Sequence, residues 1–474
     1  MKLSLRARAS VLRITFRWQC PPEIRQVMRT LLARGFQAYA VGGSVRDLLL
    51  GRPPKDWDVA TDALPDRVRG LFPRTVATGM AHGTITVLSG DRQVEVTTFR
   101  VESSYSDRRH PDAVRYVRRL ADDLARRDFT INALAADASG RLVDLFGGID
   151  HLERRWVAAV GEPGERFGED ALRMMRAVRI ASELGFDIER NTYRAIRENA
   201  SKLQHISIER IRDEFRRIVV SPHPRIGLER LRETGLLAEF LPELLEGYDF
   251  PQNRHHRYTV WEHNLIAMES VPPELELRLA ALLHDVGKPR SLSVDEEGER
   301  HFFNHEIIGA DLAYHILKRL KFEKTTVSRV VHLVRYHMAL HLAPDMKDAA
   351  IRRLIRRVGL ENMDTLLRLR EADRRASGKK PGPVSRGTLE LLRRIDRILK
   401  EDAAFGLKDL AVNGNDIMEA TGLKPGPMVG RLLSQLLEAV LEDPKVNQKE
   451  TLIALARERL AALPDSVSGE EDHG

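Results

Sequence analysis

Residues 38–61 read AYAVGGSVRDLLLGRPPKDWDVAT, and this stretch decides the fold of the first third of the chain. An apolar run leads into Gly42-Gly43-Ser44 and then into the helix-like segment VRDLLLG, before a second β-rich run at residues 57–61. Further β-rich runs, GTITVLS and QVEVTTF, follow up to Phe99 and are separated by turn residues. This alternation predicts a small α/β sheet.

Beyond about Gly168 the strand signals almost disappear, and apolar residues recur at three- and four-residue spacing, which predicts helix after helix. The expected fold is therefore α+β, a small mixed head followed by a long helical remainder. Gly- and Pro-rich breaks at residues 377–385 and 424–427 are typical of linkers. The expected parts are an N-terminal extension (1–20), a head (21–150), a helical neck (151–215), a helical body (216–250), a histidine-rich domain (251–376), a linker (377–390), a helical tail (391–464) and an acidic flexible end (465–474).

Composition limits the class of protein. The chain has 474 residues, 42% hydrophobic and 31% charged, so we expect a globular protein of about three packed units. The formal net charge of +7 favours polyanionic partners such as nucleic acids and nucleotides. A single cysteine, Cys20, excludes an intrachain disulfide framework and a cysteine-clustered zinc site, and it fits a cytoplasmic protein. No run approaches the roughly 18 apolar residues that span a bilayer, so no membrane partner is expected.

Three acids in the head predict a magnesium site. Asp56 and Asp58 are two apart on a predicted strand, which sends both carboxylates to one face, and a neighbouring strand could add Glu95. Three carboxylates suit two Mg²⁺ ions, which would activate a 3′-hydroxyl and neutralise a triphosphate during an in-line displacement. A solvated strand end would explain the Asp pair alone, but not the pair together with Glu95 and the upstream glycine turn.

Several polar residues are candidates for nucleotide binding. The backbone amides of the Gly42-Gly43-Ser44 turn would hold triphosphate. Adjacent guanidinium and carboxylate groups at residues 126–128 suit a phosphate or ribose contact. Asp170 and Arg173 are three apart on a predicted helix, where a carboxylate and a guanidinium could read the edge of cytosine or adenine; an ordinary salt bridge between them is the alternative. The candidates are Gly42, Gly43, Ser44, Arg46, Arg126, Asp128, Asp170, Arg173, Arg176 and Arg179, of which the last three arginines could instead form a solvated helix face.

The segments GGSVRD (42–47), RRDFTINA (126–133) and EDALRMMRAVR (169–179), with Asp56 and Asp58, resemble in order the motifs of class II tRNA nucleotidyltransferases and bacterial poly(A) polymerases, of the polymerase-β superfamily. The resemblance implies a polymerase-β-like head and addition of CCA to tRNA from CTP and ATP without a nucleic-acid template; no DNA partner is expected. Poly(A), A-only and CC-only enzymes on the same scaffold are alternatives. Residues 105–123 match the family's flexible loop, which argues mildly against a CC-only enzyme.

A spaced series of histidines and aspartates in the helical part resembles HD-type metal-dependent phosphohydrolases, in which such ligands hold one or two divalent ions. His263, His284, Asp285 and Asp373 match the pattern for one ion, whose identity is open, and His305 and His337 would bind a second ion or phosphate. Some members of the family with this fusion hydrolyse 2′,3′-cyclic phosphates or 2′-nucleotides, so the resemblance implies such an activity for this domain. The alternatives are a helical domain with histidines as core residues, and a hydrolase whose head only binds nucleotide.

The segment that begins at Asp409 resembles the C-terminal helical part of the same bacterial enzymes, which implies a tail that binds tRNA; plain helix packing is the alternative. The sequence does not fix whether two chains associate.

Overall fold

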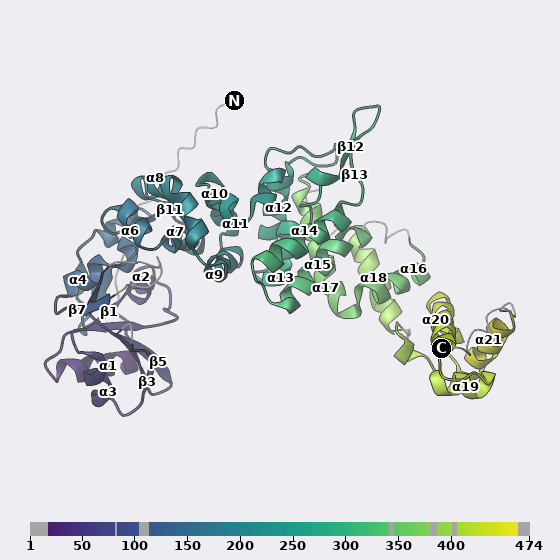
Figure 1. The fold of residues 1–474 in the computed structure, drawn as a ribbon, viewed down its shortest axis with the longest axis horizontal. Helices are drawn as coiled ribbons and strands as arrows, with labels where there is room; N and C mark the ends of the chain where they lie inside the picture. The colour runs from purple at the N-terminus through teal and green to yellow at the C-terminus, as the bar shows by residue number, and fades with distance from the viewer. Residues whose placement is uncertain are drawn as a thin grey trace, which may run out of the picture. The chain divides into compact units, whose positions relative to one another are not determined.

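The computed structural model describes residues 18–80, 83–103, 113–340, 346–379, 386–400 and 405–462. The chain forms two compact units. Unit 1 takes Met1–Glu246 with Pro273–Arg278 and Ile316–Glu323, and unit 2 takes Gly247–Pro272, Leu279–His315 and Lys324–Gly474. Strands gather in the purple to blue part of the chain, whereas the green to yellow part is almost entirely helical (Figure 1). The predicted α+β class is therefore confirmed.

A seven-stranded sheet in unit 1 has the order β3-β4-β5-β2-β1-β8-β9. Its strands are β1 (Ala38–Val41), β2 (Asp58–Thr61), β3 (Thr75–Gly79), β4 (Thr84–Ser89), β5 (Arg92–Thr98), β8 (Leu134–Ala136) and β9 (Leu142–Asp144). The pair β2 and β5 is parallel, and the other neighbours are antiparallel. A separate antiparallel pair is formed by β6 (Arg100–Ser103) and β7 (Ala113–Tyr116).

Side chains of β5 alternate between the buried and the exposed face of the sheet. Val94 and Val96 of β5 are fully buried, and Glu95 between them is exposed, as period-two geometry requires. The helices α1 (Pro22–Leu32) and α3 (Pro65–Leu71) pack against the sheet and against each other, and α2 (Gly43–Leu49) packs on β1 and β8 (Figure 1). The runs that predicted β1, β2, β4 and β5 are thus confirmed as strands.

The rest of unit 1 is mainly helical. It contains α4 (Leu120–Ala125), η2 (Thr130–Asn132), α5 (Gly148–Glu153), α6 (Pro163–Glu169), α7 (Leu172–Leu184), α8 (Arg190–Asn199), η3 (Ala200–His205), α9 (Ile208–Val219), α10 (Pro224–Glu233), α11 (Leu236–Phe240) and η4 (Pro242–Gly247), with the short strands β10 (Trp156–Val157) and β11 (Asp187–Ile188). The helix α7 lies at the centre, because it packs on both α9 and α10 and most of its side chains are buried.

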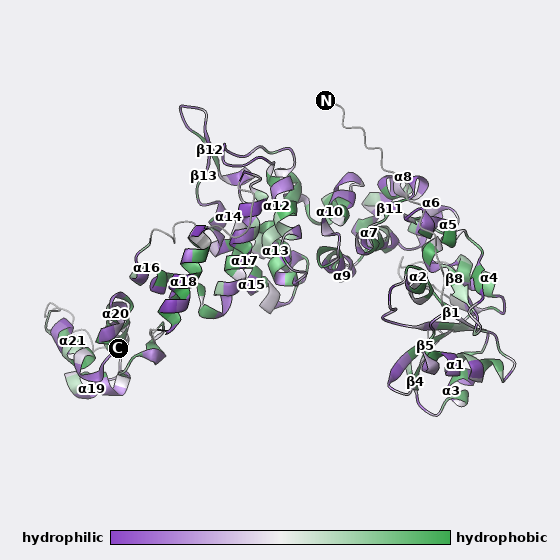
Figure 2. Cartoon of the chain, turned by 180° about the vertical axis from the view of Figure 1, so that it is seen from behind, coloured by the Kyte–Doolittle hydropathy of each residue, from purple (hydrophilic) through white to green (hydrophobic). Residues whose placement is uncertain are grey.

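Unit 2 is a helical array with one hairpin. Its elements are α12 (Val260–Glu269), α13 (Leu275–Leu283, shared with unit 1), η5 (Pro289–Ser291), β12 (Leu292–Val294), β13 (Arg300–Phe302), α14 (His305–Arg319, also shared), α15 (Lys324–Tyr336), η6 (His337–Leu340), α16 (Asp348–Val358), α17 (Leu360–Ala376) and α18 (Arg386–Lys400). Hydrophobic and hydrophilic residues alternate along α18, as in an amphipathic helix (Figure 2). The β12–β13 hairpin was not predicted from the sequence.

The last helices have a hydrophobic core of their own. They are η8 (Leu407–Asp409), α19 (Gly414–Thr421), α20 (Pro427–Glu442), η9 (Pro444–Val446) and α21 (Lys449–Ala461). Leu432, Leu436 and Leu452 are fully or almost fully buried between them. The predicted break at residues 424–427 ends where α20 begins, with Pro427 as its first residue.

Several predicted segments fall outside the described residues: most of the N-terminal extension, the acidic end, residues 380–385 of the linker and residues 104–112 of the family's loop. In the part of the chain that the structure describes, no helix combines the length and the apolar character needed to cross a membrane.

Candidate nucleotide site and metal centre

The three head acids lie near one another beside the sheet. Asp58 is the first residue of β2 and is the register partner of Glu95 on the parallel strand β5, so both side chains leave the sheet on one face. Asp56 lies in a bend before β2, so the prediction that it belongs to the strand was wrong. Burial raises the pKa of Asp58 to about 6; Arg127 opposes this shift, and the charges of Glu95 and Asp56 add to it.

Mutual repulsion among these carboxylates favours a cation between them. Among the described residues, however, the triads of His, Asp and Glu ligand atoms within 4.8 Å of one another all lie in unit 2, so the head acids do not form a closed cage. An open arrangement fits Mg²⁺, which keeps several waters and is commonly bound by one or two protein carboxylates together with substrate phosphates. The catalytic roles of Asp56, Asp58 and Glu95 remain predictions.

The glycine turn lies beside Asp58. Gly42 has φ +76°, and a Cβ atom there would stand 3.1 Å from Arg127 Nη1 and 3.6 Å from Asp58 Oδ2. The buried Ser44 hydroxyl donates to the Val41 carbonyl at 3.0 Å and therefore braces the turn. Arg46 Nη1 donates to Asn132 Oδ1 at 2.7 Å, which ties α2 to the RRDFTINA segment.

Replacing Gly42 with alanine is expected to lower the free energy of unfolding by about 1–3 kcal/mol, because alanine disfavours this backbone conformation and its methyl group would press on Arg127. Urea denaturation of the full chain would measure the loss. The matched control is Gly43→Ala, where the nearest atom belongs to the flexible Arg46 side chain at 3.4 Å. Equal stability of the two variants would contradict the expectation.

A pocket of about 310 Å³ in unit 1 collects five of the predicted nucleotide-binding residues, namely Arg126, Asp128, Asp170, Arg173 and Arg176. Its lining also includes Leu172, Arg127 and Arg210. Five arginines against two aspartates make the pocket suitable for an anionic ligand such as a phosphate chain. Arg210 was missed, because only the packing of α9 against α7 brings it to the pocket.

Asp128 is the central acid of this pocket. Its Oδ2 accepts hydrogen bonds from Arg176 Nε at 2.9 Å and Arg176 Nη2 at 2.6 Å. Burial alone would raise the pKa of Asp128, but Arg176 and the bond from Asn132 lower it from 3.8 to about 2. Its stabilising contribution is therefore complete above pH 3.8 and is lost as the pH falls through 2. The segment leads into the short η2.

Asp170 and Arg173 both line the pocket but do not share a helix face. Asp170 is extended between α6 and α7, and its Oδ2 accepts from Arg210 Nη2 at 2.7 Å. Arg173 pairs with Glu169. The prediction that Asp170 lies on the helix was wrong. The alternative, a salt bridge between Asp170 and Arg173, is also not formed, because Asp170 pairs with Arg210 and Arg173 pairs with Glu169.

Arg179 has a different environment. Only 5% of it is exposed, and it pairs with Glu214 at 2.6 Å and with Glu183 at 2.9 Å. It is not among the residues that line the pocket. The alternative of a solvated face does not hold for Arg173 and Arg179, which are both buried. The geometry favours a structural role for Arg179 over nucleotide binding.

The predicted HD residues converge in unit 2. His263 lies on α12, His305 begins α14, His337 begins η6 and Asp373 lies on α17. The His284-Asp285 doublet lies in the turn after α13, so its prediction as helical was wrong. Three triads bring ligand atoms within 4.8 Å of one another: His263, His284 and Asp285; Asp285, His305 and His337; and His256, His263 and Asp373. Because Asp285 belongs to two triads, it could bridge two ions.

The tautomers of three histidines fit a metal centre. Nδ1 of His284, His305 and His337 lies 2.6–2.8 Å from a backbone carbonyl oxygen. A carbonyl only accepts, so each Nδ1 carries a proton, and in the neutral ring Nε2 then presents a lone pair. Yet Nε2 of His305 lies 3.2 Å from Nε2 of His337. Two such lone pairs repel unless a cation or a proton lies between them, so the residues fit a bound ion.

The charges of this centre also favour a cation. Burial alone would lower the pKa of His284, but Asp285 and Asp373 raise it to about 10. Burial, with the charge of His284, lowers the pKa of His337 to about 3. The carboxylate side of the centre thus attracts a positive charge, which a divalent ion can supply.

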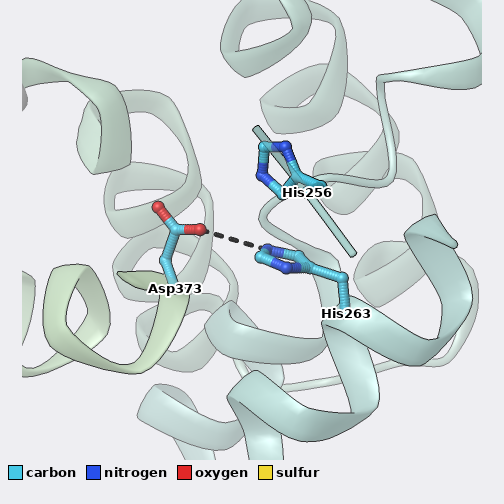
Figure 3. Close-up of side chains that lie close together, drawn as sticks. All are labelled: His256, His263 and Asp373. Atoms are coloured by element: carbon cyan, nitrogen blue, oxygen red, sulfur yellow. Dashed lines mark ion pairs between the residues drawn. The ribbon is translucent and has the colours of Figure 1, made fainter. Parts of the chain in front are cut away.

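One residue of the third triad was missed in the sequence. Figure 3 shows His256 beside His263, whose Nε2 lies 3.1 Å from Asp373 Oδ1. Burial, followed by the charge of Lys288, lowers the pKa of His256 to about 3, so it is neutral near pH 7. Because His256 lies in a loop before α12, no helical periodicity pointed to it.

Comparisons with known proteins agree with the head and the neck. Residues 38–158 match a family model described as "Poly A polymerase head domain", residues 185–247 match "Probable RNA and SrmB- binding site of polymerase A", and residues 307–456 match "tRNA nucleotidyltransferase domain 2". The last match begins inside the predicted HD segment, so the HD assignment itself remains a prediction.

Full-length relatives define the family. A CCA-adding enzyme from Geobacillus sp. is 38% identical over 426 residues, 90% of this chain and 94% of that protein. One from Lactiplantibacillus plantarum is 35% identical over 450 residues, 93% and 97% of the two chains. The crystal structure of Bacillus stearothermophilus CCA-adding enzyme in complex with CTP has a TM-score of 0.71 at 34% identity and covers 93% of this chain and 98% of that one. The chain belongs to the family of CCA-adding enzymes, the class II tRNA nucleotidyltransferases.

Proposed function

We propose that this chain completes the 3′ end of tRNA by adding CCA from CTP and ATP, with release of pyrophosphate and without a nucleic-acid template. The observation that carries the proposal is the pocket that joins Arg126–Asp128 to Asp170 and Arg173, because one of its residues, Arg127, also lies beside the glycine turn and Asp58. The CTP complex of the Bacillus stearothermophilus relative supports the nucleotide. A Thermotoga maritima CCA-adding enzyme, solved with tRNA, shares the fold with a TM-score of 0.60 at 18% identity.

Different residues of the head would have different roles in nucleotidyl transfer. Bound Mg²⁺ would supply the charge that activates the 3′-hydroxyl and neutralises the triphosphate. Asp56, Asp58 and Glu95 would hold the ions. The amide of Gly43 would face the phosphates, whereas the amide of Gly42 donates to the Leu134 carbonyl at 3.1 Å and holds the turn against β8. Arg127 already lies beside both the turn and Asp58.

Base selection falls to Asp170 and Arg173. A carboxylate accepts from an exocyclic amino group and a guanidinium donates to a ring nitrogen, the pattern that cytosine and adenine share. The pairs with Arg210 and Glu169 would hold the two side chains in place before a nucleotide arrives. The protein would then act as the template.

Replacing Asp170 with asparagine is expected to reduce discrimination of CTP against UTP by about 10- to 100-fold, since a good pair of base contacts contributes about 1–3 kcal/mol. The ratio of CMP to UMP incorporation is measured with tRNA that lacks its 3′ triplet. The control Arg179→Gln removes a buried ion-paired arginine outside the pocket, so it should lower the melting temperature and leave the ratio unchanged. An unchanged ratio in Asp170→Asn would exclude Asp170 from base selection.

The overall activity is tested with tRNA that lacks CCA and with oligo(A), each incubated with CTP, ATP or both. We expect CCA on the tRNA and no extension of oligo(A). Long A tracts without C would identify a poly(A) polymerase instead, and addition of C alone or of A alone would identify a partial enzyme.

The predicted contact between the helical tail and tRNA would appear as weaker tRNA binding when the chain ends before Phe405.

A second activity is favoured by the geometry of unit 2. Lone pairs of His305 and His337 that face each other, beside the carboxylate of Asp285, suit one or two divalent ions that activate water against a phosphate ester. We infer a metal-dependent phosphohydrolase centre at these residues, separate from nucleotide addition. Assay of cyclic and monoester phosphate hydrolysis with different divalent ions tests it.

A further inference from the structure

A closed loop carries His256 to the metal centre. Pro251 and Thr259 form an isolated β-bridge, and the amide of Val260 donates to the Phe250 carbonyl at 3.0 Å, so the two ends of the loop are held together. The loop is therefore a compact segment with defined side-chain positions.

Lys288 links this loop to the centre. Its ammonium donates to Gln252 Oε1 at 2.6 Å and lies 2.6 Å from Asp285 Oδ2. Only 5% of Lys288 is exposed, so the link is sheltered from water. Lys288 thus connects Gln252 of the loop to the Asp285 carboxylate of the centre.

His256 repeats the hydrogen-bond pattern of the helical ligands. Nδ1 of His284, His305 and His337 bonds in each case to an oxygen three residues upstream, from Ala281, Phe302 and Val334. Nδ1 of His256 bonds at 3.0 Å to Asn253 Oδ1, again an oxygen three residues upstream. This bond fixes the proton on Nδ1 and leaves the Nε2 lone pair free, as in most metal-binding histidines.

The ring is also placed for coordination. The His256 and His263 rings meet edge to face with centroids 5.1 Å apart, and both lie on the same side of the Asp373 carboxylate (Figure 3). Ligand atoms of these three residues lie within 4.8 Å of one another. The neighbouring His255 is exposed and belongs to none of the close triads among the described residues.

We propose that His256 is a further metal ligand of the unit 2 centre, which binds its ion on the His263–Asp373 side. It is the one histidine of the three triads that a loop carries, whereas the others lie on helices or at their ends. A loop can withdraw without disturbing the helices. Because a hydrolytic site needs an open position for substrate, departure of His256 would open one for a phosphate oxygen. The inference rests on the proposed metal centre and not on CCA addition.

The test uses full-length protein freed of metal by a chelator and titrated with Co²⁺, followed by visible absorption and by metal analysis after dialysis. His256→Ala is expected to weaken Co²⁺ binding at one position by about 10- to 100-fold and to change the absorption band, because a coordinating nitrogen is lost. His255→Ala is the matched control and should bind Co²⁺ as the wild type does. Wild-type affinity and spectrum in His256→Ala would overturn the proposal.

Two further measurements separate a ligand from a structural residue. Added imidazole should restore the wild-type band to His256→Ala, since it can fill the vacated position, and failure to do so would count against ligation. Asn253→Ala, which removes the oxygen that orients His256, should weaken binding by a smaller factor than His256→Ala. If the wild type itself binds no Co²⁺, the metal centre and this inference both fail, whereas CCA addition by the same preparation would be unaffected.

Discussion

Asp58→Asn is expected to reduce the incorporation of CMP and AMP into tRNA by at least about 10²–10³-fold, because it removes a carboxylate that would hold the Mg²⁺ ions at the reacting phosphate. Asparagine has nearly the same shape, so the sheet should remain intact. Burial raises the pKa of Asp58 from 3.8 to about 6, which means that its charged form is disfavoured in the folded protein. Near pH 7 the neutral side chain should therefore leave the melting temperature unchanged or raise it.

This combination of lost activity and retained stability separates catalysis from folding. The measurement is single-turnover addition of CMP to tRNA that lacks CCA, together with thermal melting. Asp66→Asn, at an exposed acid on α3, is the control and should keep full activity. Activity of Asp58→Asn within a few-fold of the wild type would show that the role assigned to Asp58 is wrong. Hydrolysis by unit 2 should persist in both variants.

Asp285→Asn is expected to abolish binding of both ions in unit 2, because this residue is shared by two of the ligand triads. Phosphate-ester hydrolysis should fall by about 10³-fold or more, since without the ion no activated water remains. CCA addition should stay at the wild-type level. Metal analysis of the purified variant gives the stoichiometry, and hydrolysis of p-nitrophenyl phosphate and its diester gives the activity.

The control for this change is another Asp–His pair. Asp295 lies 2.6 Å from His301 beside the β12–β13 hairpin and belongs to none of the close triads among the described residues. Asp295→Asn should leave metal content and hydrolysis unchanged. Full metal content in Asp285→Asn would show that the histidines alone hold the ions and that the bridging arrangement is wrong.

Local patterns in the sequence were sufficient to predict the main helices and strands of the fold. Alternation in QVEVTTF predicted β5 with Glu95 outward, and apolar spacing predicted α7, α9, α16 and α20. Both signals depend only on neighbouring residues. The β12–β13 hairpin was not predicted because its strands are only three residues long, too short for a clear alternation of apolar and polar residues.

Tertiary packing decided the features that the sequence did not predict. Arg210 reaches Asp170 only because α9 lies against α7. The spacing of Asp170 and Arg173 suggested one helix, but the chain is extended at Asp170, whose carboxylate accepts the amide of Leu172. The order of the motifs identified residues that line one pocket, whereas their pairing depended on contacts between segments 40 positions apart.

The walls of the arginine-rich pocket come from three separate stretches, around residues 127, 173 and 210. A fragment that stopped at residue 150 would keep the acids of β2 and β5 yet lack two of those walls. With the roles proposed above, such a fragment would keep the ion-holding acids but lack the residues that select the base. Base selection would then require the assembled first unit, with α7 and α9 docked.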